Sequence, residues 1–358
     1  MMRKGDTITH DVNQFANKND RTLSDVIKRM PGLEIDEGGK IKYQGKDINQ
    51  FMVEGKDLMQ GRYGVIPNAI PFGDVSKLEV IESNQPVRML KDKIPSEEPG
   101  INIRLKKNVT WTGSGSLGVG LSPYLWNVKL TPMVFNKKRQ VLFNLKSNNT
   151  GEDVIAESGN FINMSGFRGM SRENVTGTFL GMSSVGPPAN IKQSRYWYNK
   201  SAAASANFLQ SLKNDWEVKT NVLYNYQDIN LKGSSQATIT NLNNDGSVAN
   251  TLSYSRRSET NNIDRKLGAT ISLNKNGKNN FFKNDLTFGL SNNDGGASLY
   301  IDGVPTYQQI QGNGASIQNS LSTLLPLDRK GKWVANVQSF INYVYDPEWY
   351  RVDSLNAL

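Results

Sequence analysis

The sequence contains no cysteine and only one histidine, His10. Without cysteine, the chain has no disulfide framework, no thiolate nucleophile and no cysteine-ligated metal site. A single histidine cannot supply a histidine-ligated zinc centre, and it leaves almost nothing from which to build a Ser-His-Asp triad. We expect His10 to be a surface residue entering the first strand, and we expect no metal site and no cofactor.

Long apolar runs are also missing. No segment approaches the roughly 18–20 apolar residues that a membrane-spanning helix needs, and the mean hydropathy is -0.53. The basic start, Met1 to Lys4, is followed by Gly5, Asp6 and Thr7 and not by an apolar stretch, so it is not a secretory signal peptide. Strands of an outer-membrane β-barrel give no hydropathy peak, since each has only one apolar face, so a membrane location stays open.

Positive charge is in excess, but the basic residues are not concentrated in one segment. Lys and Arg number 42 against 33 Asp and Glu, a formal net charge of +9, yet they are scattered through turns and alternating positions. A nucleic-acid partner is therefore not expected. The glycine-rich stretch Gly113 to Gly118 lacks the Lys-Ser/Thr of a phosphate-binding loop. Acidic pairs such as Glu97-Glu98 lie in turn contexts, where solvated caps outnumber acid-base pairs. The residues predict no catalytic site and no enzyme.

The best-defined pattern lies between residues 19 and 63. Thr22 and Asp25 form a capping signature, and the apolar positions behind them predict a short helix reaching Met30. Pro31-Gly32 stops this helix, because proline cannot continue the hydrogen-bond ladder.

A β-hairpin is expected next. Leu33-Ile35 and Ile41-Tyr43 alternate on either side of a turn at Asp36 to Gly39, and a third β-like run extends from Ile48 to Val53. Helix, hairpin and further strand together predict a compact α+β unit.

The order of these residues resembles the plug domain of Bacteroidetes-type TonB-dependent outer-membrane receptors. The resemblance covers roughly residues 5 to 106, and it includes the later strands at Leu78-Glu82 and Ile101-Leu105. The positions that carry the plug signature are Pro31, Gly32, Tyr43, Gly45, Lys46, Gly55, Asp57, Gly61 and Tyr63.

From Thr110 onward the chain shows long runs of alternating residues separated by short basic turns. In the clearest run, one face holds Trp216, Val218, Thr220, Val222, Tyr224 and Tyr226, and the other holds Glu217, Lys219, Asn221, Leu223, Asn225 and Gln227. Strands of soluble sandwiches run about 5–6 residues, whereas outer-membrane strands run about 10 or more, with aromatic residues at both water interfaces. We therefore expect a plug at residues 1–108 and, at 109–358, about nine antiparallel strands of a transmembrane β-barrel.

Connection lengths give this sheet a direction. The turns near 136–140, 213–215, 275–279 and 328–332 are short, and the resemblance places them in the periplasm. Long external loops are expected near 148–193, 233–255 and 292–315. In the first of these loops Phe161, Phe167 and Arg168 are candidate ligand contacts, with a solvated loop around a small hydrophobic cluster as the alternative.

The resemblance implies a receptor in the cell outer membrane that binds a scarce small-molecule, glycan or peptide ligand and imports it. Members of the family have 22 strands around the plug, and the TonB complex pulls on the plug. Nothing in Met1 to Gly5 resembles the TonB-contacting segment, so we expect that segment and the signal peptide upstream of this chain. About nine strands cannot close around a plug, so an open trough with unpaired edges near 111–122 and 333–345 is expected. The alternative is a secreted or surface β-rich adhesive protein without transport.

Overall fold

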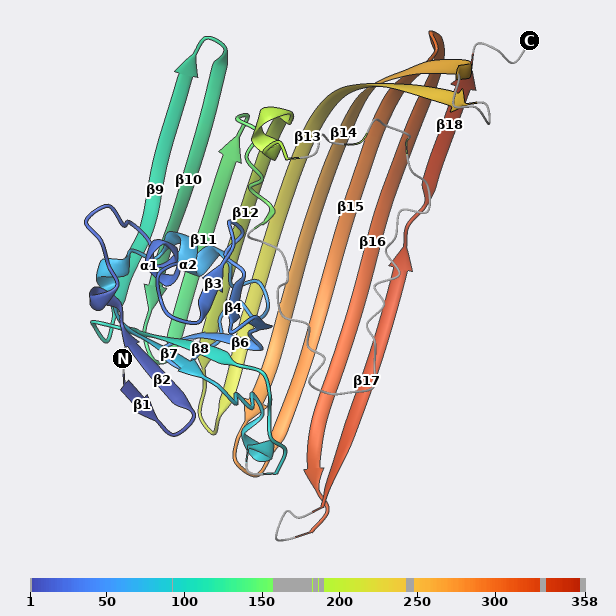
Figure 1. The fold of residues 1–358 in the computed structure, drawn as a ribbon. Helices are drawn as coiled ribbons and strands as arrows, with labels where there is room; N and C mark the ends of the chain where they lie inside the picture. The colour runs from blue at the N-terminus through green and yellow to red at the C-terminus, as the bar shows by residue number, and fades with distance from the viewer. Residues whose placement is uncertain are drawn as a thin grey trace.

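The computed structural model describes residues 2–91, 93–156, 182, 186, 190–242, 248–328 and 333–354. We call β1 to β8 the N-terminal unit and β9 to β18 the wall (Figure 1). The N-terminal unit has a five-stranded sheet of order β1-β2-β7-β8-β6 and a three-stranded sheet of order β3-β4-β5. The wall is a single open antiparallel sheet. The predicted fold class, an α+β unit followed by the antiparallel strands of a partial barrel, is confirmed.

The elements of the N-terminal unit are β1 Met2–Lys4, β2 Thr7–Asp11, η1 Val12–Gln14, α1 Leu23–Ile27, β3 Leu33–Ile35, β4 Ile41–Tyr43, β5 Lys46–Asp47, β6 Gln50–Val53, α2 Val65–Ala69, η2 Phe72–Asp74, β7 Val75–Ile81, η3 Arg88–Leu90 and β8 Gly100–Leu105. Those of the wall are β9 Thr110–Leu121, β10 Tyr124–Phe135, β11 Arg139–Asn148, η5 Gln193–Arg195, β12 Tyr198–Ser211, β13 Trp216–Leu242, β14 Val248–Asn276, β15 Phe281–Ile301, β16 Val304–Pro326, β17 Val334–Tyr345 and β18 Glu348–Ser354.

Helix α1 begins where the capping signature predicts. The Thr22 backbone N–H donates to Asp25 Oδ2 at 3.0 Å, which satisfies a donor at the helix start. The prediction that the helix reaches Met30 is wrong, because α1 ends at Ile27. The Met30 N–H bonds to Ile27 O, only three residues back, so the chain has already tightened into a turn before Pro31.

The predicted hairpin is confirmed, with Leu33 opposite Tyr43. Its turn requires Gly39, which has φ +85° and lies so close to Gly64 that a Cβ would stand 2.4 Å from the Gly64 carbonyl oxygen. The third β-run does not extend this hairpin. It forms β6, which pairs in parallel with β8 in the larger sheet, while the two-residue β5 completes the hairpin sheet.

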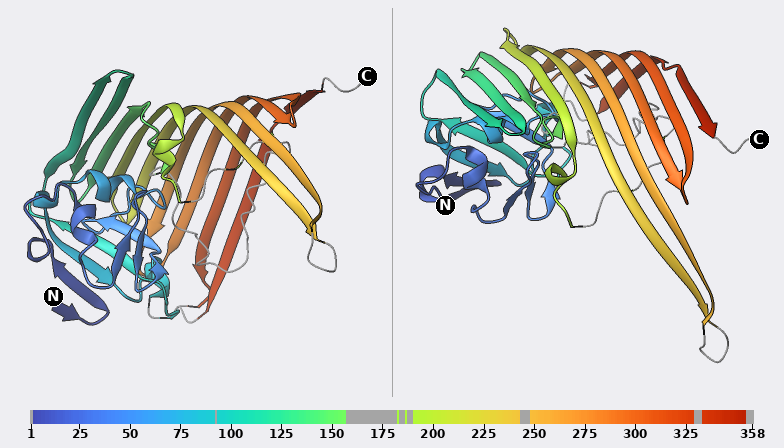
Figure 2. Two further views of the ribbon diagram at one scale, coloured as in Figure 1. Left: turned by 45° about the horizontal axis from the view of Figure 1, so that its top comes forward. Right: turned by 90° about the horizontal axis from the view of Figure 1, so that it is seen from above.

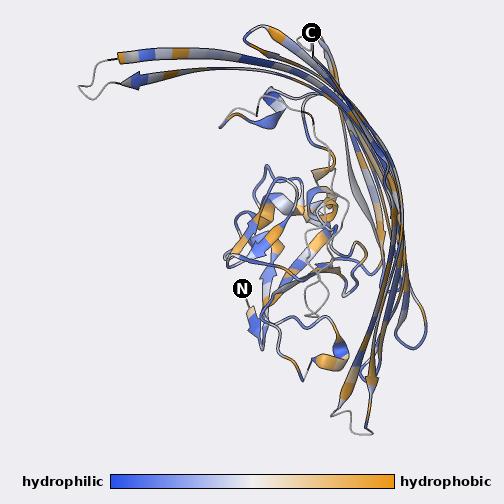
Figure 3. Ribbon diagram, turned by 90° about the vertical axis from the view of Figure 1, so that its right-hand side faces the viewer, coloured by the Kyte–Doolittle hydropathy of each residue, from blue (hydrophilic) through white to orange (hydrophobic). Residues whose placement is uncertain are grey.

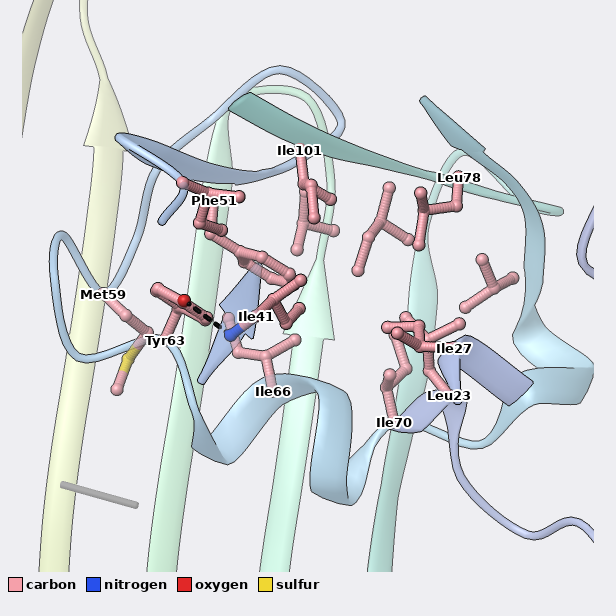
Figure 4. Close-up of a cluster of buried hydrophobic side chains, with 14 of the residues drawn as sticks. Leu23, Ile27, Ile41, Phe51, Met59, Tyr63, Ile66, Ile70, Leu78 and Ile101 are labelled. Atoms are coloured by element: carbon pink, nitrogen blue, oxygen red, sulfur yellow. Dashed lines mark hydrogen bonds between the residues drawn. The ribbon is translucent and has the colours of Figure 1, made fainter. Parts of the chain in front are cut away.

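The core of the N-terminal unit is apolar and continuous (Figure 4). Phe51 and Tyr63 stack at its centre with ring centroids 4.9 Å apart, and the Tyr63 hydroxyl accepts a hydrogen bond from the Ile41 backbone N–H at 3.0 Å. Burial raises the pKa of the Tyr63 phenol far above its ordinary value. Four wall residues join the same cluster: Met133, Phe135, Leu142 and Leu209.

The expectation that His10 lies on the surface is wrong. His10 is 0% exposed, because β2 pairs with β1 and β7 and its alternate residues Ile8 and His10 point into the core. The His10 ring packs edge-on against Phe15, with ring centroids 5.7 Å apart. Neither ring nitrogen has a hydrogen-bond partner among the described residues, and burial lowers the pKa of His10.

The wall follows a path of nine strands from β9 to β17, as predicted, with each strand antiparallel to the next. β18 continues β17 along β16 in the same register, since Ala315 lies opposite Tyr345 and Gly312 opposite Glu348. The ladder is interrupted only where Pro347 has no N–H to donate. β9 and the β17–β18 line are the two unpaired edges, at the predicted positions.

The loop predictions are partly wrong. The short turns near 136–140, 213–215 and 275–279 lie at one end of the wall, as expected, and most of the turn near 328–332 lies outside the described residues. Residues 292–315 and most of 233–255, however, continue the strands β13 to β16. These segments are rich in Asn, Gly and Ser, and their remaining apolar side chains, such as Ile239 and Leu252, lie on the opposite face from those of the band. The alternation of the band therefore does not continue, although the hydrogen-bond ladder does. β13 and β14 therefore extend beyond their neighbours as a two-stranded hairpin (Figure 2).

The wall is curved, and the N-terminal unit lies against its concave face (Figure 3). The far end of the β13–β14 hairpin leans to the same side.

Candidate functional site

The two faces of β13 differ as the alternation predicts. Lys219 and Asn221 point to the concave side and are 6% and 2% exposed, whereas Val222 and Tyr224 point to the convex side and are 38% and 41% exposed. The predicted separation of polar and apolar positions onto opposite faces is therefore confirmed.

The convex face carries an apolar band with an aromatic–cation pair at each margin. Lys275 lies over the ring of Trp216 at 5.4 Å, and Arg265 lies over the ring of Tyr226 at 5.8 Å. From Trp216 to Tyr226 is about ten residue steps of roughly 3.3 Å, which at a strand tilt of about 40° spans roughly 25 Å. This height matches the lipid-facing band of an outer-membrane barrel.

The band continues across the neighbouring strands. Exposed convex side chains along it include Leu130, Phe143, Leu145, Leu267, Ile271, Phe288, Leu290, Ile317, Val337 and Ile341. Beyond Tyr226 the convex positions of β13 become polar, at Asp228 and Asn230. In the part of the chain that the structure describes, no helix has the length and apolarity to cross a membrane.

On the concave side the N-terminal unit contacts the wall through polar groups as well as through the shared apolar cluster. Lys56 Nζ forms an ion pair with Glu217, and the amide of Asn221 donates to the Leu58 carbonyl at 3.4 Å. The amide of Gln140 donates to the Val53 carbonyl at 2.7 Å. All three contacts involve either Val53, the last residue of β6, or the segment that follows β6.

Asp57 lies at the centre of this interface. Burial raises the pKa of its carboxyl group, and the positive charges of Lys219 and Lys283 oppose that rise. Lys219 also lies 4.0 Å from Glu217, and Lys283 lies 3.0 Å from Asp285. The resulting cluster joins both signs of charge across the N-terminal unit and two wall strands, β13 and β15.

The interface is incompletely satisfied. Asp57 Oδ1, Gln140 Oε1 and Asn221 Oδ1 are shielded from solvent and have no hydrogen-bond partner among the described residues. Buried polar atoms without partners are costly, so these three atoms weaken the contact. The apolar core of the N-terminal unit is by comparison well packed.

A second contact lies nearer the short turns. The Arg88 backbone N–H donates to Asn276 Oδ1 at 2.9 Å, and the Asn276 amide donates to the Pro86 carbonyl at 2.7 Å. The Arg88 guanidinium also forms an exposed ion pair with Asp215 at 3.3 Å. A small apolar cluster accompanies these bonds and consists of Val87, Met89, Leu90, Phe281 and Leu324.

The plug-signature residues fall into two groups. Gly55, Asp57, Gly61 and Tyr63 lie on the loop from β6 to α2, which carries Lys56 and faces the wall. The Gly55 N–H donates to Asn102 Oδ1 at 2.8 Å, which ties this loop to β8.

The other signature residues lie around the hairpin sheet. Pro31 and Gly32 follow α1, and Gly45 and Lys46 follow β4. Tyr43 on β4 donates its hydroxyl to Glu82 at 3.1 Å. This second group shapes the N-terminal unit and forms no hydrogen bond to the described wall residues.

The candidate ligand contacts Phe161, Phe167 and Arg168 lie outside the described residues. Sequence reasoning also missed the wall partners Gln140, Asn276, Lys283 and Asp285. The sequence signal that could have identified them is that they are polar residues at positions facing the concave side of the wall.

The extension of the β13–β14 hairpin has the opposite polarity to the band. Ile239 lies opposite Leu252 and Ala237 opposite Tyr254, and these four occupy the concave face. The convex face there holds Thr238, Thr240, Thr251 and Ser253. An apolar concave surface and a hydrophilic outer surface suit a part of the wall that lies beyond the membrane.

Among the described residues no group of three or more His, Asp or Glu side chains could hold a metal ion. No protein-family model matches the sequence, and no curated protein matches it either.

Solved structures of several transporters and receptors resemble the chain. The copper transporter OprC has 12% identity and a TM-score of 0.25 over 95% of this chain and 60% of its own. The unliganded ferric citrate transporter FecA has 8% identity and a TM-score of 0.29 over 97% and 60%. A mutant of the ferric enterobactin receptor PfeA from Pseudomonas aeruginosa has 11% identity and a TM-score of 0.26 over 95% and 71%. The chain thus spans about three fifths of the first two proteins.

Proposed function

We propose that this chain is the plug and part of the barrel wall of a TonB-dependent outer-membrane receptor that binds a scarce ligand outside the cell and imports it. The observation that carries the proposal is the pair of contrasting wall faces. The convex face has an apolar band of membrane height bounded by Trp216 and Tyr226. The concave face of β13 is polar over the same height, and an α+β unit lies against part of the concave side (Figure 1). We take residues 1–108 as the plug and 109–358 as barrel strands.

The open edges support a larger barrel. β9 and the β17–β18 line present unpaired backbone groups, which invite pairing with further strands. Barrel diameter grows with strand number, and nine strands cannot enclose a plug of about 100 residues. The family resemblance implies 22 strands, and the signature residues favour the Bacteroidetes type.

The plug contact suits movement under load. Its own core is apolar and continuous. The contact with the wall shares a few apolar side chains with that core, but it also depends on Lys56, Asp57 and their partners, among which several polar atoms are unsatisfied. A pull on the plug would break the wall contact before the core, because local opening follows the least stable interactions. We propose the TonB complex as the source of that pull and the β13–β14 extension as part of the ligand side.

Fractionation tests the membrane location. The full-length protein that contains this chain should sediment with outer membranes, resist extraction by salt and high pH, and enter solution only with detergent. Recovery in the soluble or secreted fraction would contradict the proposal and favour an adhesive β-protein.

Import requires a separate test. In cells that express the full-length protein, ligand uptake should require TonB, and Asp57→Asn or Lys56→Gln should alter uptake while ligand binding at the surface persists. Uptake that is indifferent to loss of TonB would contradict the coupling.

A further inference from the structure

The two ends of the wall differ in charge. At the end with the short turns, the β10–β11 turn carries Lys137, Lys138 and Arg139, and the linker from β8 to β9 carries Lys106 and Lys107. The next turns of the same end add Lys213, Lys275 and Lys278. The opposite end carries both signs of charge near its turns, with acidic groups at Glu152, Asp153, Asp302, Asp346 and Glu348 and cations at Lys200, Arg256 and Arg257.

The acidic groups near the short turns are already engaged. Asp215 forms an ion pair with Arg88 at 3.3 Å, and Asp328 accepts from the Trp333 backbone N–H at 3.0 Å. Lys137 and Lys138 are exposed and form no ion pair with any described residue. This end therefore has uncompensated positive charge.

A shallow, open groove of about 420 Å³ lies between the β10–β11 turn and the linker before β9. Its lining residues are Asn108, Asn136, Lys137, Lys138, Arg139 and Gln210, without a carboxylate among them. Three cations and three amides in one groove are suited to bind a phosphate group, which accepts several charge-assisted hydrogen bonds.

The groove is partly preorganised. Asn136 Oδ1 accepts hydrogen bonds from the Lys138 and Arg139 backbone N–H groups at 2.8 and 2.6 Å, which fixes the turn. The Arg139 side chain donates to Gln210 Oε1 at 2.8 Å, so its guanidinium is held at the rim of the groove.

Exposed apolar side chains lie in the segments beside the groove. Val109, next to the lining residue Asn108, is 53% exposed, and Trp111 on β9 is 80% exposed. Leu212, two residues after the lining residue Gln210, is 51% exposed. Trp111 lies opposite Val134, at the margin of the convex band. A soluble anion would use the cations and leave this apolar surface in water.

We propose that this groove binds an anionic phospholipid, with the phosphodiester at Lys137, Lys138 and Arg139 and the acyl chains along Val109, Trp111 and Leu212. The combination of a basic cluster with an adjoining apolar surface is what attracts anionic lipids at a membrane interface. The proposal rests on the membrane location of the wall, but it requires neither ligand import nor coupling to TonB.

The test is lipid retention by the full chain in detergent micelles doped with equal amounts of phosphatidylglycerol and phosphatidylcholine. Native mass spectrometry counts the bound lipids. We expect phosphatidylglycerol to be retained at least tenfold over phosphatidylcholine, and added salt should reduce this ratio by screening the cations. Equal retention of the two lipids would overturn the proposal.

Substitutions locate the site. Lys137→Gln, Lys138→Gln and Arg139→Gln together should reduce the ratio about tenfold. The matched control removes three cations at the opposite end, by Lys200→Gln, Arg256→Gln and Arg257→Gln, and should leave the ratio unchanged. Equal loss in both triple variants would show a general charge effect and overturn the site. Should the first triple variant fail to fold, Lys138→Gln alone, expected to lower the ratio about threefold, replaces it.

A soluble competitor distinguishes lipid from free phosphate. Glycerol 3-phosphate shares the phosphate chemistry but has no acyl chains, so it should not displace phosphatidylglycerol at equal concentration. Full displacement would identify a phosphate site without lipid specificity and would overturn the lipid assignment. The fractionation test measures membrane localisation without these lipid ratios, so a failure of the proposed function can be told apart from a failure of the lipid site.

Discussion

The N-terminal unit and the wall place their apolar side chains in opposite ways. The N-terminal unit buries Leu23, Phe51 and Ile101 in a shared core, and its longest strand, β7, has 7 residues. The wall leaves Val222 and Ile317 exposed on its convex face, and β13 and β14 have 27 and 29 residues. The first is stabilised by removing apolar surface from water, whereas the second has a continuous ladder and an apolar surface suited to lipid. Substitutions should therefore act differently in the two regions.

The largest effect is expected in the core of the N-terminal unit. Phe51→Ala removes a ring that is 2% exposed and stacked on Tyr63, so it should cost about 3–5 kcal/mol of local stability. Amide exchange of β6 and β8 in the full chain measures this loss. Glu34→Ala, at an exposed position of β3, is the control and should stay within about 0.5 kcal/mol. Equal effects of the two substitutions would contradict the core assignment.

Next in size is a charge on the convex band. Ile317→Arg should cost about 2–4 kcal/mol in a bilayer, because position 317 lies near the middle of the band. Gln318→Arg places the same charge on the concave face of the same strand and should cost far less. Urea unfolding of the full-length receptor in lipid vesicles compares them. Similar losses of unfolding free energy in the two variants would mean that both faces of the strand are in the same kind of environment.

The buried histidine predicts a pH effect confined to the N-terminal unit. Since burial lowers the His10 pKa below its ordinary 6.5, stability is full above that value. As the pH falls below it, the unfolded state binds a proton that the folded state does not, and stability drops by at most about 1.4 kcal/mol per pH unit.

His10→Leu removes this dependence, because the chain has no other histidine. Amide exchange of β2 and β7 at pH 5.5 and 7.5, corrected for intrinsic exchange rates, should show a pH-dependent loss in the wild-type chain alone. A variant with an undiminished pH response would show that other groups cause it.

A smaller effect is expected where the two regions meet. The Lys56–Glu217 ion pair is partly shielded, with side chains 26% and 14% exposed. A double-mutant cycle with Lys56→Gln and Glu217→Gln should give a coupling of about 1 kcal/mol. Amide exchange in the loop from β6 to α2 measures this coupling energy. If the effects of the two single substitutions are additive, the ion pair contributes nothing to the contact.

The smallest effect concerns the end of α1. Pro31→Ala should loosen the junction by less than about 1 kcal/mol, because the wider backbone freedom favours the unfolded state. Faster amide exchange in residues 33–43 is the expected result, and unchanged protection would contradict a role for Pro31 in fixing the hairpin.

The sequence predicted the elements whose signal is local. The Thr22–Asp25 cap, the hairpin from Leu33 to Tyr43 and the two faces of β13 follow from residue spacing alone. The nine-strand path and its open edges also followed, since each wall strand alternates within the band.

What the sequence did not predict depends on distant neighbours. Alternation does not tell which sheet receives β6, and the polarity of His10 hides its place in the core. Beyond the band, β13 to β16 continue as strands although many positions are Asn, Gly or Ser and the apolar face has changed sides. The partners of Lys56 and Asp57 on the wall could not be named, because period-two patterns give a face and not a contact.

The central claim is that the convex face of the wall contacts lipid. Because the chain contains no cysteine, this claim can be tested directly by site-directed labelling. Single cysteines introduced one at a time from 217 to 230 in the full-length receptor can carry nitroxide labels without background labelling of this region. Accessibility to oxygen should peak at 218, 220, 222 and 224 and be low between them, and at 228 and 230 it should give way to accessibility to an aqueous nickel chelate. A profile without period two, or aqueous accessibility at 222 and 224, would contradict the account.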